Sequence, residues 1–350
     1  MKLILPLALV PLALIARDDL STKYEQDRWV VVESSITMET EVTDFEMLID
    51  GEPPEGNRGG GGGDSSTSLT RSIVTADRVM EAGEDGPTRV LREFRSVGGS
   101  QTMSSGDQER ESQANSPLGG VTLELALEDG EVSASVSDGD SQEDAQLQGH
   151  SMTLALDALL PDGDMDEGDS WDLDKEALGK ALGLELQQVL FTRPERAEGG
   201  GGERGGGRGR RGGGGGNTSG LAELGQIDWE GEAKFGGSVD HDGTACYEIS
   251  IKFEGSGELP EREFGGLGRD RAVTPNTELL AWVGTDLEIE LEGRLLVSIE
   301  GHLPVLLELE GELTREMERT MDRGERTMEM SRTTEGTLKI QIEVSTESAE

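Results

Sequence analysis

The chain has 350 residues, of which 72 are Asp or Glu and 31 are Lys or Arg, so its net charge is −41 at pH 7. A surface this acidic repels nucleic-acid phosphates and anionic membranes, and aromatic residues, at 3%, are too few for a base-stacking surface. One cysteine excludes an internal disulfide framework and a multi-cysteine zinc site, and three histidines are few for a histidine-rich metal centre. We therefore predict no cofactor and no nucleic-acid partner.

The N-terminus has the features of a secretory signal peptide. Lys2 precedes an apolar run from Leu3 to Ala16 that only two prolines interrupt, and the charged residues Arg17-Asp18-Asp19 follow. This order is typical of signal peptides, and the apolar run is shorter than the roughly 20 residues of a membrane-spanning helix. We predict a signal peptide over residues 1–16, no stable membrane span, and a periplasmic or secreted protein after cleavage.

Residues 17–198 form the first predicted unit, which is rich in β-strands. A glycine run at residues 59–63 cannot bury apolar surface, and we expect a flexible loop there. Asp129-Gly130 is a strong hairpin signal between two of the predicted strands. Alternation of apolar and polar residues predicts strands at Trp29–Met38, Val42–Ile49, Ser72–Met80, Thr88–Val97, Val121–Leu127 and Val132–Val136.

A cluster of carboxylates near the end of this unit resembles a calcium loop. Asp162, Asp164 and Asp166 stand at alternate positions, as calcium ligands do. The cluster departs from the calcium-loop pattern, because its sixth position is Glu167 rather than glycine and its twelfth is Leu173 rather than glutamate. The three aspartates are candidate metal ligands, and the alternative is a chance cluster in an acid-rich chain.

One helix is predicted near residues 174–190. Ala177, Leu178, Ala181 and Leu182 would lie on one helical face, and Asp174 is suited to cap the N-terminus. We expect this helix to cover one end of a sheet.

A Gly- and Arg-rich segment, residues 199–216, separates the first unit from the second, residues 217–350. Its 13 glycines and 4 arginines resemble RNA-binding RGG boxes, but it has no interleaved aromatic residues and the chain is strongly acidic. A flexible surface loop is the interpretation that these features favour, with folding back onto the protein's own acidic surface as an intermediate possibility.

The second unit alternates with a period of two. From Leu287 to Leu313 the odd positions are apolar and the even positions mostly charged, which predicts a sheet with one dry and one wet face. One strand of this length would span about 90 Å, so we expect a loop with an odd number of residues near Glu300 to Pro304. The apolar residues move to even positions from Met328 on, which predicts an even-numbered hairpin loop at Asp322-Arg323-Gly324. Ile227–Phe235 and Cys246–Phe253 form another expected pair.

The dry face of the second unit is the candidate binding surface. If the sheet leaves it open, it could hold a lipid or another apolar ligand, and otherwise it is ordinary core. The candidate residues are Leu287, Ile289, Leu291, Leu295, Val297, Ile299, Leu303, Val305 and Leu307.

No residue is assigned a catalytic role. Ser238, Asp240, His241 and Asp242 contain the components of a hydrolytic triad, but triads assemble from distant segments, and glycines around these residues suit a hairpin tip. A pair of carboxylates in a cleft could serve a hydrolase of the cell envelope, which we keep as an alternative function.

One phrase of the sequence carries a family resemblance. Leu160-Pro161-Asp162-Gly163 is followed by Gly168-Asp169-Ser170-Trp171. With the signal peptide and the long amphipathic strands, this phrase resembles uncharacterised exported bacterial β-rich proteins of the domain-of-unknown-function type. The resemblance implies an extracytoplasmic, non-enzymatic β-protein and transfers no catalytic residues.

The sequence as a whole predicts a mainly β protein, built as an antiparallel long-stranded half-barrel or sandwich in two units. We expect a non-enzymatic binding or structural protein of the cell envelope, whose partner is an envelope protein or an apolar small molecule. A periplasmic carrier of a lipid or other apolar ligand is the alternative within binding proteins.

Overall fold

The computed structural model describes residues 20–26, 28–54, 65–83, 86–161, 163–191, 219–259, 281–323 and 326–348. The predicted signal peptide, the glycine loop 59–63, the segment 199–216 and Asp162 lie outside the described residues.

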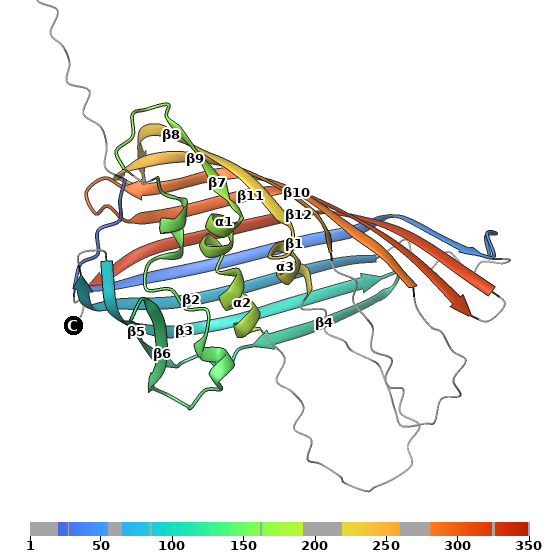
Figure 1. The fold of residues 1–350 in the computed structure, drawn as a ribbon, viewed down its shortest axis with the longest axis horizontal. Coiled ribbons are helices and arrows are strands. Elements are labelled where there is room, and N and C mark those ends of the chain that lie inside the picture. The colour runs from blue at the N-terminus through green and yellow to red at the C-terminus, as the bar shows by residue number, and fades with distance from the viewer. Residues whose placement is uncertain are drawn as a thin grey trace, which may run out of the picture.

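The described chain forms one curved, open, antiparallel sheet (Figure 1). Its order is β6-β5-β3-β2-β1-β12-β11-β10-β9-β8-β7, and β4 pairs with β3 off this path. The strands are β1 (Arg28–Ile49), β2 (Ser65–Gly83), β3 (Gly86–Ser105), β4 (Gln108–Asn115), β5 (Thr122–Glu128), β6 (Glu131–Asp138), β7 (Ser170–Asp174), β8 (Asp228–His241), β9 (Thr244–Leu259), β10 (Ala281–Ser298), β11 (Pro304–Arg323) and β12 (Arg326–Ser348).

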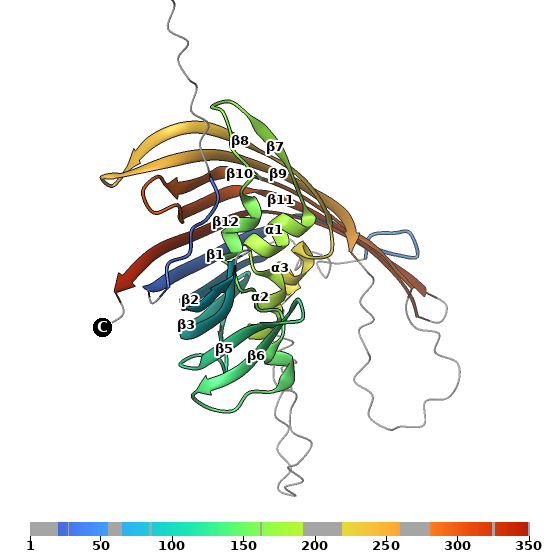
Figure 2. The same cartoon turned by 60° about the vertical axis from the view of Figure 1, so that its left-hand side comes forward.

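The prediction of a mainly β, antiparallel protein with long strands is confirmed, and of the two expected architectures the structure is the half-barrel. Figure 2 shows the curvature of the sheet around a group of short helices. Strands from both predicted units belong to the same sheet, because β1 hydrogen-bonds to β12 along its whole length.

The alternation of residues decides which side of the sheet faces the helices. We call that side the inner face; Leu291, Leu309 and Ile340 lie on it and are buried, whereas their neighbours Glu290 and Glu310 lie on the outer face and are exposed. A hydrophobic core of aliphatic and some aromatic residues therefore fills the concave side, and carboxylates cover much of the convex side.

The predicted loop lengths are confirmed by the strand register. Five residues lie between Ser298 at the end of β10 and Pro304 at the start of β11, and the parity is kept from the pair Leu296–Leu306 onward. A register shift between Leu296 and Val297 makes Val297 the partner of Pro304. Arg323 pairs with Arg326, so two residues separate β11 from β12 and the parity changes. Asp129 and Gly130 have positive φ values of 52° and 87°, as a two-residue hairpin turn between β5 and β6 requires.

Glycines on the inner face let the sheet curve this strongly. A Cβ atom at Gly311 would overlap the carbonyl oxygen of Glu290 on the neighbouring strand, and one at Gly293 would overlap that of Glu308. Glycine in a strand interior is typical of tight bends where backbones approach closely. The curvature of β10 and β11 therefore depends on these two positions having no side chain.

Short helices cover the middle of the inner face. They are the 3₁₀ helices η1 (Asp144–Leu147) and η2 (Ala155–Leu159) and the α-helices α1 (Lys175–Ala181), α2 (Leu184–Leu190) and α3 (Ser219–Leu224). We call η2, α1, α2 and α3 the helical cover. Leu156, Leu178 and Leu221 of this cover are buried in the same hydrophobic cluster as Leu291 and Ile340 of the sheet.

The single helix expected near residues 174–190 is two helices. Asp174 caps α1 as predicted and accepts a hydrogen bond from the backbone N–H of Ala177 at 2.8 Å. The helix ends because Gly183 has a φ of +57°, the left-handed conformation that commonly terminates helices. The apolar periodicity continues through this break, which is why it suggested one helix.

Candidate functional site

Most of the predicted binding wall lies under the helical cover. Leu287, Ile289, Leu291, Leu295, Val297 and Leu307 are buried in the main hydrophobic cluster, and Ile299, Leu303 and Val305 are half-buried around the β10–β11 loop. The buried six belong to the same hydrophobic cluster as leucines of the cover, and a ligand would reach them only if this core opened. Their role in binding stays a prediction.

A small cavity lies between the inner face and the cover. Its volume is about 100 Å³, and Ile73, Leu186, Ile342 and Val344 are among the apolar residues that line it. It is smaller than the roughly 300–1,000 Å³ of typical small-molecule sites. The cavity shows that the cover does not fill the concave side completely.

A buried ion pair forms part of the cavity wall. Asp77 on β2 and Arg92 on β3 are paired across the strands, and Arg92 donates from Nε to Oδ1 at 2.8 Å and from Nη2 to Oδ2 at 2.5 Å. Arg92 also donates to the carbonyl oxygen of Ser151 at 3.1 Å. Burial opposes the charge of Arg92, but Asp77 outweighs burial and raises its pKa. Through the hydrogen bond to Ser151, the pair holds the segment that leads into the helical cover against the sheet.

His150 lies beside this pair and is buried against the ring of Phe94. Burial first, and the positive charge of Arg92 second, lower the pKa of His150 to about 4. Its Nε2 lies 3.1 Å from the carbonyl oxygen of Gln146 and can donate to it. His150 is therefore neutral at physiological pH and serves packing.

The N-terminal segment is hydrogen-bonded to η2 of the helical cover through a second polar cluster. Thr22 donates to Asp157 of η2 at 2.5 Å, Tyr24 donates to the other carboxylate oxygen, and the N–H of Leu154 donates to the Tyr24 hydroxyl at 2.8 Å. Burial, then the charge of Asp157, raises the pKa of Tyr24, and burial raises that of Asp157. The partners of Asp157 here are hydroxyls rather than a second carboxyl, so this cluster is a fastening and gives no support to a carboxylate-pair hydrolase.

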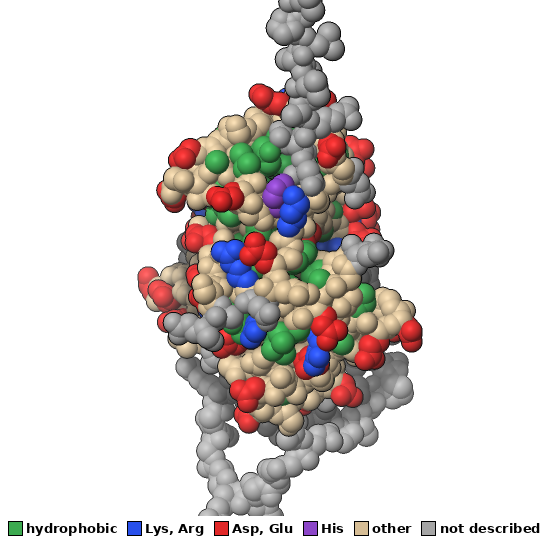
Figure 3. Space-filling model, turned by 90° about the vertical axis from the view of Figure 1, so that its left-hand side faces the viewer, with side chains coloured by type: hydrophobic (Ala, Val, Ile, Leu, Met, Phe, Trp, Pro, Cys, Tyr) green, Lys and Arg blue, Asp and Glu red, His purple; other side chains and the backbone are tan. Residues whose placement is uncertain are grey.

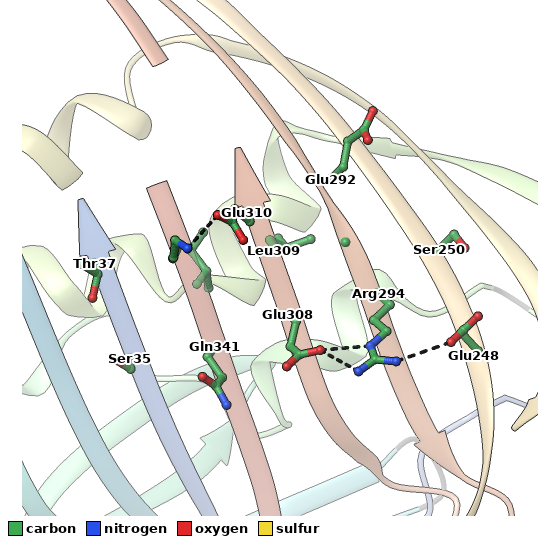
Figure 4. A pocket seen from close by; sticks show the side chains of 13 residues that line it. Ser35, Thr37, Glu248, Ser250, Glu292, Arg294, Glu308, Leu309, Glu310 and Gln341 are labelled. Carbon is green, nitrogen blue, oxygen red and sulfur yellow. Dashed lines mark hydrogen bonds and ion pairs between the residues drawn. The ribbon is translucent and has the colours of Figure 1, made fainter. Parts of the chain in front are cut away.

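A larger hollow lies on the outer face and is lined mainly by polar residues. It measures about 630 Å³ and is lined by side chains from β1, β9, β10, β11 and β12. Figure 4 shows Arg294 between two carboxylates: it donates to Glu308 at 3.0 Å and lies 3.9 Å from Glu248. Other ion pairs between neighbouring strands also lie on the outer face of the sheet. Acidic side chains surround the end of the molecule seen in Figure 3 as well. Most of the residues that line the hollow are polar or charged, whereas ligand pockets are usually lined mainly by apolar side chains.

The apolar inner face continues beyond the helical cover. In Figure 1 the helices lie over the middle and left-hand parts of the sheet, and the right-hand ends of β10, β11, β12 and β1 project past them. The side chains there are half-buried apolar residues together with exposed or half-buried arginines. We call this the distal surface: Phe45, Met47, Ile49, Met317, Arg319, Met328, Met330 and Arg332.

The remaining predicted site residues are the candidate metal ligands and the residues around His241. Asp164 is exposed and Asp166 half-buried; with Asp162 outside the described residues, the proposed metal site stays a prediction. No group of three or more potential metal ligands occurs within the described ranges. His241 lies at the end of β8, next to the turn formed by Asp242 and Gly243, as expected for a hairpin tip.

The distal surface was not among the predicted site residues, although the sequence contains its signal. Met328 and Met330 share the even parity of Leu338 and Ile340, and Arg332 stands on that same parity. An arginine at an apolar position marks a place where the inner face meets solvent. The prediction followed only the aliphatic residues and therefore stopped at the covered part.

The sequence matches no protein-family model and no curated protein. Across the described ranges, no helix combines the length and the apolar character needed to cross a membrane.

Proposed function

We propose that this chain is a non-enzymatic binding protein that holds an apolar chain-like ligand on the inner face of its half-barrel, at the distal surface. The observation that carries the proposal is that the apolar inner face extends past the helical cover. A contiguous apolar surface rimmed by polar residues is typical of binding sites.

The chemistry of the distal surface suits a flexible apolar ligand. Met47 pairs with Met330 across β1 and β12, and Ile49 pairs with Met328. Methionine side chains are unbranched and polarisable, so they adapt to ligands of different shape. Met103 on β3, with 46% of its surface exposed, extends the same side of the sheet. The surface is therefore suited to acyl chains rather than to one rigid molecule.

The proposal includes export to the cell envelope. Its support is the sequence of residues 1–16, which has the order of a signal peptide. A carrier in that compartment would shelter an apolar chain from water as it moves between membranes.

The test uses the neutral apolar dye N-phenyl-1-naphthylamine and protein purified without detergent. Met47 and Leu48 are neighbours on β1, both half-buried, but Met47 is on the inner face and Leu48 on the outer face. We expect Met47→Gln to weaken dye binding about fivefold, because it removes apolar contact worth about 1 kcal/mol. The matched variant Leu48→Gln should leave the affinity unchanged.

Two outcomes would refute the proposal. One is absence of saturable dye binding to the unaltered protein. The other is a dimer in solution that Met47→Gln dissociates, because the distal surface would then be an interface between two copies.

A further inference from the structure

The two faces of the sheet beyond the cover carry opposite charges. Among side chains described on β4, on β1 from Val42, on β11 from Arg315 and on β12 up to Thr334, the ionisable residues at inner positions are Arg110, Arg315, Arg319, Arg326 and Arg332. The acids of these stretches occupy outer positions: Asp44, Glu46, Glu109, Glu111, Glu316, Glu318 and Glu329. Although the net charge of the protein is −41, the ionisable side chains described at inner positions of these four stretches are all cations.

One of these arginines is neutralised at the edge of the helical cover. Glu223 of α3 forms an ion pair with Arg315 of β11. Burial, then the nearby positive charge of Arg332, lowers the pKa of Arg315. The carboxylate from the cover thus balances the first cation at the edge, and Arg332 is the next cation outward.

Arg332 lies in apolar surroundings and has no carboxylate partner among the described residues. Phe45 of β1 is directly opposite it on one side and Met317 of β11 on the other. Its guanidinium donates one hydrogen bond, at 3.3 Å, to the hydroxyl of Ser65 on β2. The side chain is exposed, so its remaining donors can reach a ligand.

We infer that the ligand of the distal surface is an anionic single-chain lipid, whose acidic headgroup binds Arg332 while its chain lies along the methionines. This inference rests on the proposed function and specifies its ligand. Charge complementarity favours an anionic group, because a guanidinium binds carboxylate or phosphate through paired, charge-assisted hydrogen bonds. The outer face, with its rows of carboxylates, repels the same headgroup, so the ligand is directed to one face.

The experiment compares three amphiphiles with the same chain. Dodecanoate, dodecanol and dodecylammonium are titrated below their micelle concentrations, and each displaces N-phenyl-1-naphthylamine from the protein. We expect dodecanoate to bind about tenfold more tightly than dodecanol, with dodecylammonium weakest. The dodecanoate affinity should fall as salt is added, because the headgroup contact is partly exposed.

Arg332→Gln should abolish the preference for dodecanoate over dodecanol, each measured by displacement of the same dye from the variant. Arg294→Gln removes an equal charge from the outer face and should preserve the preference. Circular dichroism and thermal unfolding confirm that both variants are folded, and Arg332→Lys should retain part of the preference.

The outcomes separate this inference from the proposed function. Equal affinity for the three amphiphiles, with dye binding intact, overturns the inference and leaves the apolar site standing. Loss of the preference in Arg294→Gln as well overturns it, because the effect would then be one of net charge. The inference is also overturned if an acidic amphipathic peptide binds to the protein and dodecanoate does not. Failure to bind the dye at all refutes the proposed function itself.

Discussion

The ion pair between Asp77 and Arg92 gives the sharpest test of the energetics of this fold. Both residues are 7% exposed, and two hydrogen bonds join them. Replacing Arg92 with Met leaves the carboxylate of Asp77 buried without its cation. Removing one partner of a buried pair costs about 3–5 kcal/mol, which lowers the folding equilibrium constant on the order of 10²- to 10⁴-fold.

The double variant Asp77→Leu/Arg92→Met should recover most of this loss. Apolar replacement of a whole buried pair is neutral or stabilises by about 1–4 kcal/mol, whereas loss of the hydrogen bond to Ser151 costs about 1–3 kcal/mol. The two effects largely cancel, so we expect the double variant to lie close to the unaltered protein. Urea denaturation followed by circular dichroism measures both variants.

A second variant tests whether burial of the pair is the cause. The control is Arg95→Met on the same strand, whose two-bonded partner Glu347 is exposed, and its loss should be much smaller.

Two results would refute this reasoning. If the double variant were as unstable as Arg92→Met, the loss would come from packing or from Ser151 rather than from the buried charge. If Arg95→Met lost as much stability as Arg92→Met, burial of the charged pair would not be the source.

Three further predictions concern stability. Gly311→Ala should lower the folded yield, because its Cβ atom would overlap the backbone of β10, whereas Gly179→Ala in α1 has open space and should stabilise by roughly 0.5–1 kcal/mol; thermal unfolding compares the two. Because the pKa of His150 is lowered to about 4, the unfolded state binds its proton first, so stability should fall as the pH drops from about 6.5 to 4, and His150→Leu should flatten that part of the denaturation profile. Tyr24→Phe should cost about 1–3 kcal/mol, because buried Asp157 loses a donor; an unchanged denaturation midpoint would contradict the fastening described above.

Local patterns in the sequence predicted the strands and their faces. The odd parity from Leu287 to Leu313 fixed the inner face of β10 and β11, and Asp129-Gly130 fixed a turn, because both depend on neighbours along the chain. The pairing of β1 with β12 could not be predicted in this way. Its partners are far apart in the sequence, and alternation does not specify which strand lies beside which.

The site was harder to predict than the fold, for a physical reason. Leu291 and Met330 carry the same apolar signal, yet one is buried under helices and the other lies past them. The difference depends on where the helical cover ends, which Gly183 and the ion pair of Glu223 help to set. Neither feature has a period that a sequence pattern would reveal.

The pairing of β1 with β12 also has a consequence for folding kinetics. Its partners lie roughly 300 residues apart in the sequence, while the remaining long strands pair mostly with their neighbours along the chain. Each group of neighbouring strands can assemble early, but β1 must wait for β12, which is synthesised long after it. Until then β1 and β11 each have an unpaired edge in the middle of the future sheet. Pairing of β1 with β12 should limit the folding rate, and the chain would need protection from aggregation until these strands pair.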